Sequence, residues 1–331
     1  MKQKHIQHLY LRSGFGIETK VLDKIKSKPK SKIIEYLFSD SEKMIPLQLN
    51  LTEFNLIKNK SPKVLKKEMG EAAFRKLRQK SRKKVRDLNH LWIDRLTDQS
   101  CMLREKMTLF WANIFVCRDN HIFHIQHYNN TLRENALGNF RSFVKAIAKE
   151  ASMSKYLNNS QNKKQRPNEN FARELMEIFT LGVGNYTEED IKESARAFTG
   201  WSFKVNGDFT VRKKQHDFDE KTFFGKNGKF NGDDIIDIIL EQKQCARFIC
   251  EKIYKYFVNP VVDESNLEEI TTLFYKDYNI KSLMNHIFSS TWFYDEQNIG
   301  VKIKSPIELL VGIRIVVPVI FNKKNQLNYL Q

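Results

Sequence analysis

Residues typical of helix starts and helix ends flank two short segments within residues 167–201, and this pattern predicts a pair of α-helices. Asn168 can cap the first helix, and Gly182 stands where a left-handed residue would close it. Thr187 is placed to begin the second helix, and Gly200 to end it. The pattern therefore predicts helices over 169–181 and 188–199, joined by a tight turn.

The first of these helices has an apolar face and a charged face. The residues at helical spacing that should face a core are Phe171, Leu175, Ile178 and Phe179. The polar residues on the other faces are Glu169, Arg173 and Glu177, four apart, with Asn170 and Glu174 beside them. Such a ladder is usually solvated, contributing about 0.2–0.5 kcal/mol per pair. The segment lacks a nucleophile elbow, a phosphate-binding glycine loop and paired metal-binding histidines. It is a candidate site without an assigned reaction.

A second polar cluster follows, formed by His216, Asp217 and Lys221. A His beside an Asp in a polar loop can act as a base, a ligand or an anion contact. If these residues fold back over the first helix, they would meet the side chains of Asn168, Glu169, Arg173 and Arg196. That group would combine acid, base and cation, as a hydrolytic or anion-binding pocket does. The alternatives are that His216 is an ordinary loop residue and that Trp201, a candidate binding residue, belongs to the core.

The remaining sequence predicts a mostly α, multi-helix globular domain. Further helices are expected near residues 19–27, 31–38, 63–94, 99–117, 131–150, 233–240, 243–257, 265–275, 280–289 and 305–316. One β-hairpin is expected near 202–212, where alternating apolar residues flank Asn206 and Gly207. A single domain over 1–331 is the simplest organisation, with a division in the polar loop near residue 160 as the alternative.

The positive charge of the chain is concentrated in one segment. Residues 58–86 hold thirteen Lys or Arg and two Glu, a net +11 of the total +17. A cationic helix face can neutralise phosphates, but a charged run on a helix is more often its solvated side. No recognition-helix, RNA-binding strand or zinc-finger motif accompanies it. Nucleic-acid binding is therefore not favoured. The triplet His121, His124 and His127 is interpreted as part of a loop, and metal binding there is not favoured either.

Several blocks of the chain resemble an uncharacterised bacterial family, domain of unknown function 1800. They are NENFARELMEIFTLGVGNYTEEDIKESARAFTGW at 168–201, LYLRSGFG at 9–16, REKMTLFW at 104–111, NNTLRENALGNF at 129–140, QHDFDEKTFFG at 215–225 and IKSPIELLVG at 303–312. The resemblance covers nearly the whole chain and implies no established activity or cofactor. It implies a partner, since members are often encoded beside a sulfatase-like protein.

Two departures from the family pattern bear on this copy. The family typically has two histidines after the tryptophan of the REKMTLFW block, and Ala112 and Ile114 stand at those positions here. Neither side chain can bind a metal or titrate. The family also continues beyond the last block, whereas this chain ends at Gln331 after the apolar tail IRIVVPVIF. The resemblance thus implies a C-terminally truncated copy that has lost any metal site at those histidines.

Two functions from different classes remain. The chain has no signal peptide, no CxxC pair and no apolar run long enough for a bilayer, so we expect a cytoplasmic, soluble protein. The lost histidines favour a non-catalytic, partner-binding scaffold. The alternative is a hydrolase-like enzyme acting on a polar or anionic substrate through the Glu, Arg, His and Asp side chains named above. An open cavity at those residues would favour the enzyme, and a closed, fully paired network the scaffold.

Overall fold

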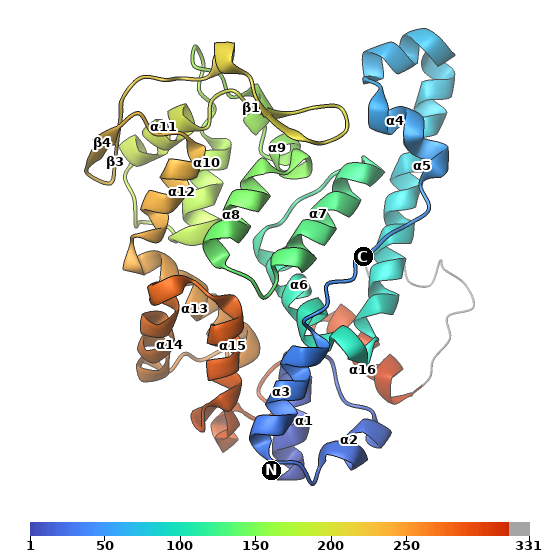
Figure 1. The fold of residues 1–331 in the computed structure, drawn as a ribbon, viewed down its shortest axis with the longest axis vertical. Helices are drawn as coiled ribbons and strands as arrows, with labels where there is room; N and C mark the ends of the chain where they lie inside the picture. Colours follow the sequence, from blue (N-terminus) through green and yellow to red (C-terminus); the bar gives the residue numbers. More distant parts are fainter. Residues whose placement is uncertain (318–331) are drawn as a thin grey trace.

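The computed structural model describes residues 1–317, and regular structure in that range is mostly helical (Figure 1). The helices are α1 (Gln3–Ser13), α2 (Thr19–Ile25), α3 (Lys30–Asp40), α4 (Asn55–Asn59), α5 (Pro62–Leu96), α6 (Met102–Ile114), α7 (Ile122–Asn135), α8 (Phe140–Lys149), α9 (Ala151–Tyr156), α10 (Asn170–Glu174), α11 (Glu188–Ala197), α12 (Gly232–Leu240), α13 (Lys243–Phe257), α14 (Glu264–Asp277), α15 (Ile280–Ser289) and α16 (Pro306–Val316). The strands are β1 (Trp201–Phe203), β2 (Phe209–Val211), β3 (Lys221–Phe223) and β4 (Lys226–Gly228). The predicted mostly α fold is confirmed.

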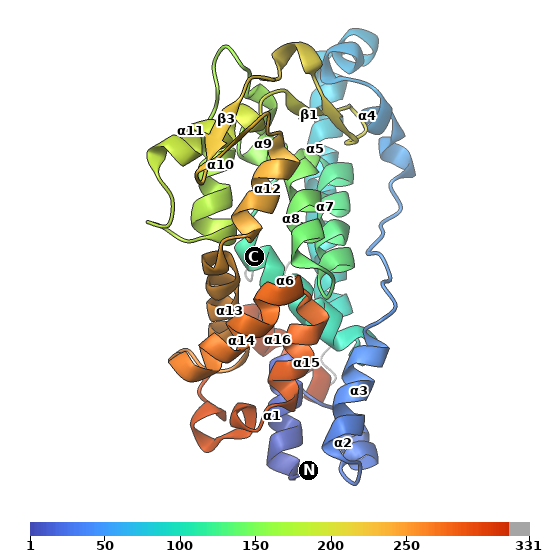
Figure 2. The same cartoon turned by 60° about the vertical axis from the view of Figure 1, so that its left-hand side comes forward.

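The helices form an elongated body with α5 along one side (Figures 1 and 2). Helix α6 runs through the middle. Helices α1–α3 and α13–α16 occupy the lower half of Figure 1, and α7–α12 with both hairpins occupy the upper half. The predicted polar site therefore lies at the end of the molecule opposite the N-terminus.

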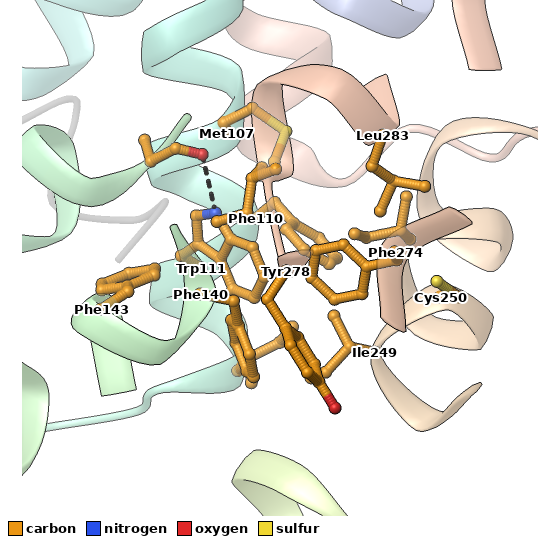
Figure 3. Packing of buried hydrophobic residues seen from close by; sticks show 14 of the residues in the cluster. Met107, Phe110, Trp111, Phe140, Phe143, Ile249, Cys250, Phe274, Tyr278 and Leu283 are labelled. Atoms are coloured by element: carbon orange, nitrogen blue, oxygen red, sulfur yellow. Dashed lines mark hydrogen bonds between the residues drawn. The ribbon is translucent and has the colours of Figure 1, made fainter. Parts of the chain in front are cut away.

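Helix α6 supplies the centre of the main core. Trp111 is fully buried, packs against Phe140 and Phe143, and donates its Nε1–H to the carbonyl of Ala136 at 3.1 Å (Figure 3). A buried indole needs such a partner for its N–H. Because Ala136 lies between α7 and α8, this bond ties the α7–α8 turn to α6.

The two positions where the family resemblance implies histidines lie on this helix. Ile114 is buried in the same core, and Ala112 packs at its edge. Within residues 1–317, no group of three or more His, Cys, Asp or Glu is placed to hold a metal ion. At position 114 an apolar side chain thus packs in the core.

Helix α5 departs from its prediction by a sharp break. The sequence predicts a helix over 63–94, and the helix extends from residue 62 to residue 96, but Gly70 interrupts it with φ +82° and ψ 158°. Glycine adopts such a conformation without steric cost, and a glycine inside a helical pattern is a weak stop signal. The chain folds back there, and a second cluster forms from Leu47, Leu51, Phe54, Ile57, Leu65, Phe74, Leu88 and Ile122.

Two hairpins stand where one is predicted. The first pairs Trp201 with Val211 and Phe203 with Phe209, which confirms the hairpin near 202–212. The second, β3 with β4, turns through Phe224 and Gly225, both with positive φ. This turn lacks the Asn-Gly pair that marks the first hairpin in the sequence.

The region around the three histidines also differs from its prediction. The sequence predicts a loop before one helix over 131–150, whereas α7 begins at Ile122 and a turn at residues 136–139 separates it from α8. Asn139 caps α8 through Ser142 N–H at 3.3 Å, a start signal inside the predicted helix. His124 and His127 therefore lie on the first turns of α7.

The main cluster of buried apolar side chains takes members from both sides of residue 160. The single domain and the alternative division near that residue stay predictions. No helix within residues 1–317 combines the length and apolar character needed to cross a bilayer. The apolar run 313–321 belongs to α16 as far as Val316, and its part from Pro318 lies outside the described residues, as does the predicted truncation.

Candidate functional site

The helix that begins the predicted site changes type midway. Asn168 lies one residue before the N-cap of α10, which is Glu169, and its Oδ1 accepts the Asn170 N–H at 3.1 Å. After α10 the chain forms a π-helix over Leu175–Thr180. Gly182, with φ +84°, closes it as predicted. The prediction that Ile178 faces the core is wrong, because its side chain is 44% exposed while Met176 is buried. The wider π turn, which pairs residue i with i+5, shifts the helical register.

Arg173 ties this helix to α11. Its guanidinium bonds both carboxylate oxygens of Glu188, at 2.9 and 3.1 Å, and lies 3.4 Å from Glu169 and 3.6 Å from Glu177. These contacts, above all that with Glu188, raise the pKa of Arg173. Burial, with the nearby Glu177, raises the pKa of Glu174. The group is a largely exposed bridge between two helices.

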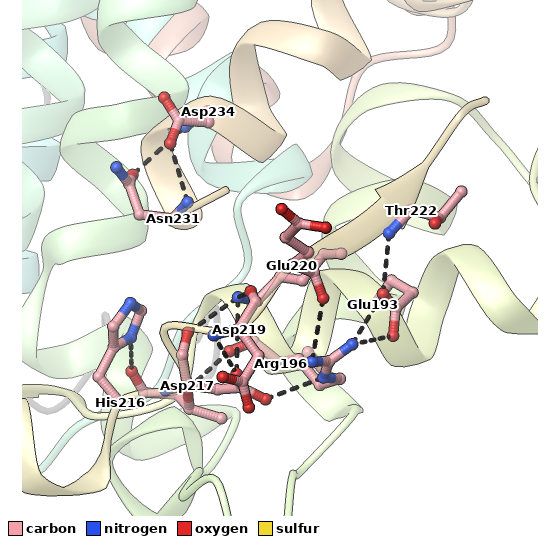
Figure 4. Close-up of polar contacts among 12 residues, drawn as sticks. Glu193, Arg196, His216, Asp217, Asp219, Glu220, Thr222, Asn231 and Asp234 are labelled. Carbon is pink, nitrogen blue, oxygen red and sulfur yellow. Dashed lines mark hydrogen bonds and ion pairs between the residues drawn. The ribbon is translucent and has the colours of Figure 1, made fainter. Parts of the chain in front are cut away.

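Arg196 is the centre of a second polar group (Figure 4). Its Nε donates to Asp217 at 2.8 Å, its Nη1 donates to both oxygens of Glu193 at 2.7 and 2.9 Å, and its Nη2 donates to the carbonyl of Glu220 at 3.2 Å. The bond to Asp217 contributes most to raising the pKa of Arg196. Burial opposes ionisation of Asp217, but Arg196 and the Asp219 N–H lower its pKa. Every charge in the group has a partner.

Two carboxylates of α11 also accept hydrogen bonds from backbone N–H groups of the second hairpin. Glu193 accepts the Thr222 N–H at 2.9 Å, and Asp190 accepts the Phe224 N–H at 3.1 Å. Asp190 also forms a capping box with Thr187, which begins α11 as predicted. An unpaired strand edge would otherwise leave these donors unsatisfied. The acidic side chains of α11 therefore act as hydrogen-bond acceptors that hold β3.

The remaining predicted residues are buried within this arrangement. His216 places Nδ1 2.7 Å from the carbonyl of Thr199, so Nδ1 donates, and its ring packs against Phe218. Lys221 donates to the carbonyls of Asp217 and Asp219, both at 2.8 Å, and burial lowers its pKa. Trp201 is buried against Phe198 and Phe209. We name the side chains of Asp190, Glu193, Arg196, His216, Asp217 and Lys221 the paired network.

The structure brings only part of the predicted site together. Asp217 and Arg196 are in contact, and His216 lies beside them. Within residues 1–317, no hydrogen bond or ion pair joins Arg173 or Glu169 to His216 or Asp217. Four cavities formed by the described residues are lined by other side chains.

The largest of these cavities is a groove of about 850 Å³ between α5 and the β1–β2 hairpin. Its lining cations are Lys60, Arg75, Arg78, Arg82, Arg118, Lys155 and Lys204, and its lining acids are Glu71 and Asp119. We call this cavity the basic groove. In Figure 1 the hairpin points toward the upper end of α5 across it.

The floor of the basic groove holds a cluster of titratable side chains. Asp119 bonds Lys155 at 2.7 Å, and Lys155 also contacts Nδ1 of His124. Although burial opposes it, bonding to His124 and Lys155 lowers the pKa of Asp119. The rings of His121 and His124 stack at 3.8 Å, and burial with the neighbouring His124 lowers the pKa of His121 to about 4.

A second cavity of about 480 Å³ lies on the other side of His124. His127 bonds Glu150 at 3.0 Å, and Thr131 donates its hydroxyl to the same carboxylate. The bond to Glu150 raises the pKa of His127. The turn of the first hairpin separates the two cavities, because Gly207 packs directly on the His124 ring.

The basic groove was not predicted, although signals for it are present in the sequence. Arg75, Arg78 and Arg82 recur every three or four residues, and a helix places such residues on one face. His121 and His124 have the same spacing. The contact between α5 and the hairpin could not be predicted, because a sequence pattern does not indicate that a hairpin more than a hundred residues later lies opposite this face.

Comparison with known proteins identifies the chain at the level of its family. The family model described as protein of unknown function (DUF1800) matches residues 8–329. No curated protein and no solved structure matches the chain significantly. Since the family match spans nearly the whole length, this chain belongs to the DUF1800 family, in agreement with the resemblance of its sequence blocks.

Proposed function

We propose that this protein is a non-catalytic binding protein and that its basic groove binds an extended polyanion, with single-stranded nucleic acid as the ligand that fits best. The observation that carries the proposal is the charge of the groove lining, seven cations against two acids. Neutralisation of phosphates by Lys and Arg drives sequence-independent binding to nucleic acids.

Several of these cations are not committed to other contacts. Within residues 1–317, Arg75, Arg82, Arg118 and Lys204 have no ion-pair partner, whereas Lys155 is paired with Asp119 and Lys60 with Glu68. Unpaired cations around the groove leave their positive potential available to a ligand. In the exposed ion pairs elsewhere on the surface, a neighbouring carboxylate neutralises the charge of the cation.

Aromatic side chains stand among the cations. Tyr156 lines the groove and is 45% exposed, and Phe203 lines it from the hairpin. Stacking of bases on aromatic side chains, combined with a cationic wall, is the usual way of binding single strands without sequence preference. A duplex has its bases stacked inside and would use only the cations.

The arrangement of the paired network supports a binding function over the hydrolase alternative. Its carboxylates, its arginine and its lysine bond one another or the backbone, and the described cavities lie elsewhere. A general acid or base needs a position within hydrogen-bond reach of a substrate. His216 has its Nδ1 committed to Thr199 and its ring against Phe218.

The test is fluorescence anisotropy of the full chain with a labelled single-stranded oligonucleotide. The binding constant should fall with salt, and the double variant Arg75→Gln/Arg82→Gln should lower the slope of log K against log salt by about 1 per residue. The matched control is Lys20→Gln/Lys24→Gln, which removes two exposed lysines of α2, far from the groove.

Competition against the labelled oligonucleotide, by unlabelled oligonucleotide and by poly-glutamate, separates the alternatives. If poly-glutamate displaces the label as well as the unlabelled oligonucleotide does, nucleic acid is rejected as the specific ligand and an acidic protein surface is favoured. The sulfatase-like companion implied by the resemblance would then be the partner to test. Equal binding by the wild type and the groove variant would reject the groove itself.

A further inference from the structure

A second concentration of positive charge lies inside the lower half of the molecule, away from the basic groove. Three chain segments meet there: α1 with Arg12, α6 with Lys106, and the start of α16 with the residues before it, which carry Glu308 and Lys302. These segments carry three of the sequence blocks by which the chain resembles its family. Neither the paired network nor the basic groove includes them.

Among residues 1–317, Glu308 is the single acid that lines this site, and its carboxylate oxygens accept four hydrogen bonds. Its Oε1 accepts from Lys106, from Lys302 at 2.8 Å and from the Tyr256 hydroxyl at 3.1 Å. Its Oε2 accepts the Ser305 N–H at 3.0 Å. Burial opposes ionisation, but the two lysines lower the pKa of Glu308. One ionised carboxylate therefore serves two ammonium groups.

The cations around the site outnumber this carboxylate. Arg12, Lys106, Lys302 and Lys304 line it together with His8, and Arg12 and Lys106 are 4% and 2% exposed. Within residues 1–317 the guanidinium of Arg12 makes one hydrogen bond, from Nη2 to the carbonyl of Asn298 at 3.0 Å. Its other N–H groups remain available to a ligand.

The site surrounds a half-open cavity of about 60 Å³. One water needs about 10–15 Å³ by this measure, so the cavity has room for several waters or for one small oxyanion. Buried charge without a counter-ion is costly, by several kcal/mol per ion. Two changes relieve that cost, namely proton loss from Lys106 or an anion in the cavity. Burial, with the neighbouring Lys302, lowers the pKa of Lys106 to about 7.

We propose that this cavity is a binding site for a small divalent oxyanion, inorganic phosphate or sulfate, held by Arg12, Lys106 and Lys302. Arginine and lysine are the side chains that bind oxyanions most strongly, the first through paired N–H groups and the second as a point charge. The bound anion neutralises the excess charge and keeps Lys106 protonated. The site is independent of the polyanion proposed for the groove.

The test is isothermal titration calorimetry of the full chain with sodium sulfate and with sodium phosphate, in chloride buffer at matched ionic strength. We expect saturable binding of one anion per chain. Lys302→Gln should weaken it about ten- to a hundredfold, because a hydrogen bond to a charged group is lost. Lys304→Gln, at an exposed position, provides a second variant with little risk to folding. Arg82→Gln, in the basic groove, should leave the affinity unchanged.

The pH dependence gives an additional readout. Sulfate keeps its charge between pH 6 and pH 9, whereas Lys106 loses its proton there, so sulfate affinity should fall as the pH rises through about 7. The other charged or titratable groups facing the site are His8, Arg12, Tyr256, Lys302, Lys304 and Glu308. Burial lowers the pKa of His8 to about 4, so His8 stays neutral over this interval.

Three outcomes would overturn the proposal. Heat of binding no larger for sulfate and phosphate than for chloride would exclude an oxyanion site. Unchanged affinity in both Lys302→Gln and Lys304→Gln would place the anion elsewhere. Loss of affinity in Arg82→Gln would show that the anion binds the groove. Sulfate binding without phosphate binding, or the reverse, keeps the site and selects its ligand.

Discussion

The paired network and the basic groove are both rich in charge, yet they use it in opposite ways. In the network, Arg196 bonds two carboxylates and a carbonyl, and Lys221 bonds two carbonyls. In the groove, Arg75 and Arg82 line a large cavity without ion-pair partners among the described residues. Charge density in a sequence therefore does not locate a binding site. The number of committed partners of each charge separates structural roles from binding roles.

The largest expected effect comes from the backbone that supports the network. Gly200 has φ +75°, and a Cβ there would lie 2.8 Å from the carbonyl oxygen of Arg212. Gly200→Ala should lower the free energy of unfolding by about 2–4 kcal/mol, from a left-handed residue and from overpacking. The control is Gly184→Ala, with φ +84° and open space, for which about 1 kcal/mol is expected. Urea unfolding measures both, and equal losses would contradict a tightly packed network.

The next effect compares the two arginines of the predicted site. Arg196→Met leaves Glu193 without its cation and leaves Asp217 with only the longer contact of 3.8 Å to Lys221, in a largely buried group, so a loss of about 2–3 kcal/mol is expected. Arg173→Met removes a more exposed bridge and should lower the free energy of unfolding by less than about 1 kcal/mol. If thermal unfolding ranks the two variants in the reverse order, the distinction between the exposed bridge and the network is wrong.

The lowered pKa of His121, in the floor of the basic groove, should make the free energy of unfolding depend on pH. Burial holds the pKa of His121 near 4, below that of an unfolded histidine near 6.5. The unfolded state then binds more protons between these values, so stability is complete above about pH 6.5 and falls as the pH drops toward 4. His121→Leu should flatten part of this slope. His8, whose pKa is also lowered to about 4, and His5, whose pKa is lowered, contribute in the same direction, whereas His127, whose pKa is raised, contributes in the opposite direction. Urea unfolding at several pH values checks this, and an unchanged slope would contradict burial of the imidazole.

The smallest effect is expected from the groove wall. Arg75→Gln/Arg82→Gln removes charges that make no ion pair in the described structure, so the free energy of unfolding should change by less than about 0.5 kcal/mol. Loss of positive charge from a chain of net +17 could even stabilise it slightly. A large destabilisation in urea would mean that these arginines hold together the two parts of α5 on either side of Gly70.

Local signals in the sequence predicted the parts of the fold that depend on neighbours along the chain. Thr187, Gly182 and the Asn206-Gly207 turn occupy their expected positions, because caps and turns act within a few residues. The π turn that exposes Ile178 and the break at Gly70 were not predicted. Both depend on packing that helical periodicity does not encode.

The candidate site was predicted less well, for the same reason. The contact of Arg196 with Asp217 followed from chain proximity, but the separation of Arg173 from His216 did not. The groove joins α5 to a hairpin more than a hundred residues away, and the oxyanion site joins α1 to the start of α16. These are long-range tertiary contacts. The sequence shows that the residues are charged, but it does not show that they are neighbours in the fold.

The measurement that tests the central claim most directly is oligonucleotide binding by three proteins in parallel: the wild type, the groove variant Arg75→Gln/Arg82→Gln and the network variant Arg196→Met. We predict that the groove variant stays as stable as the wild type but binds more weakly and with a smaller salt slope, whereas the network variant loses stability and, where folded, keeps its affinity. Weaker binding by the folded network variant together with wild-type binding by the groove variant would contradict the account and assign the ligand to the network.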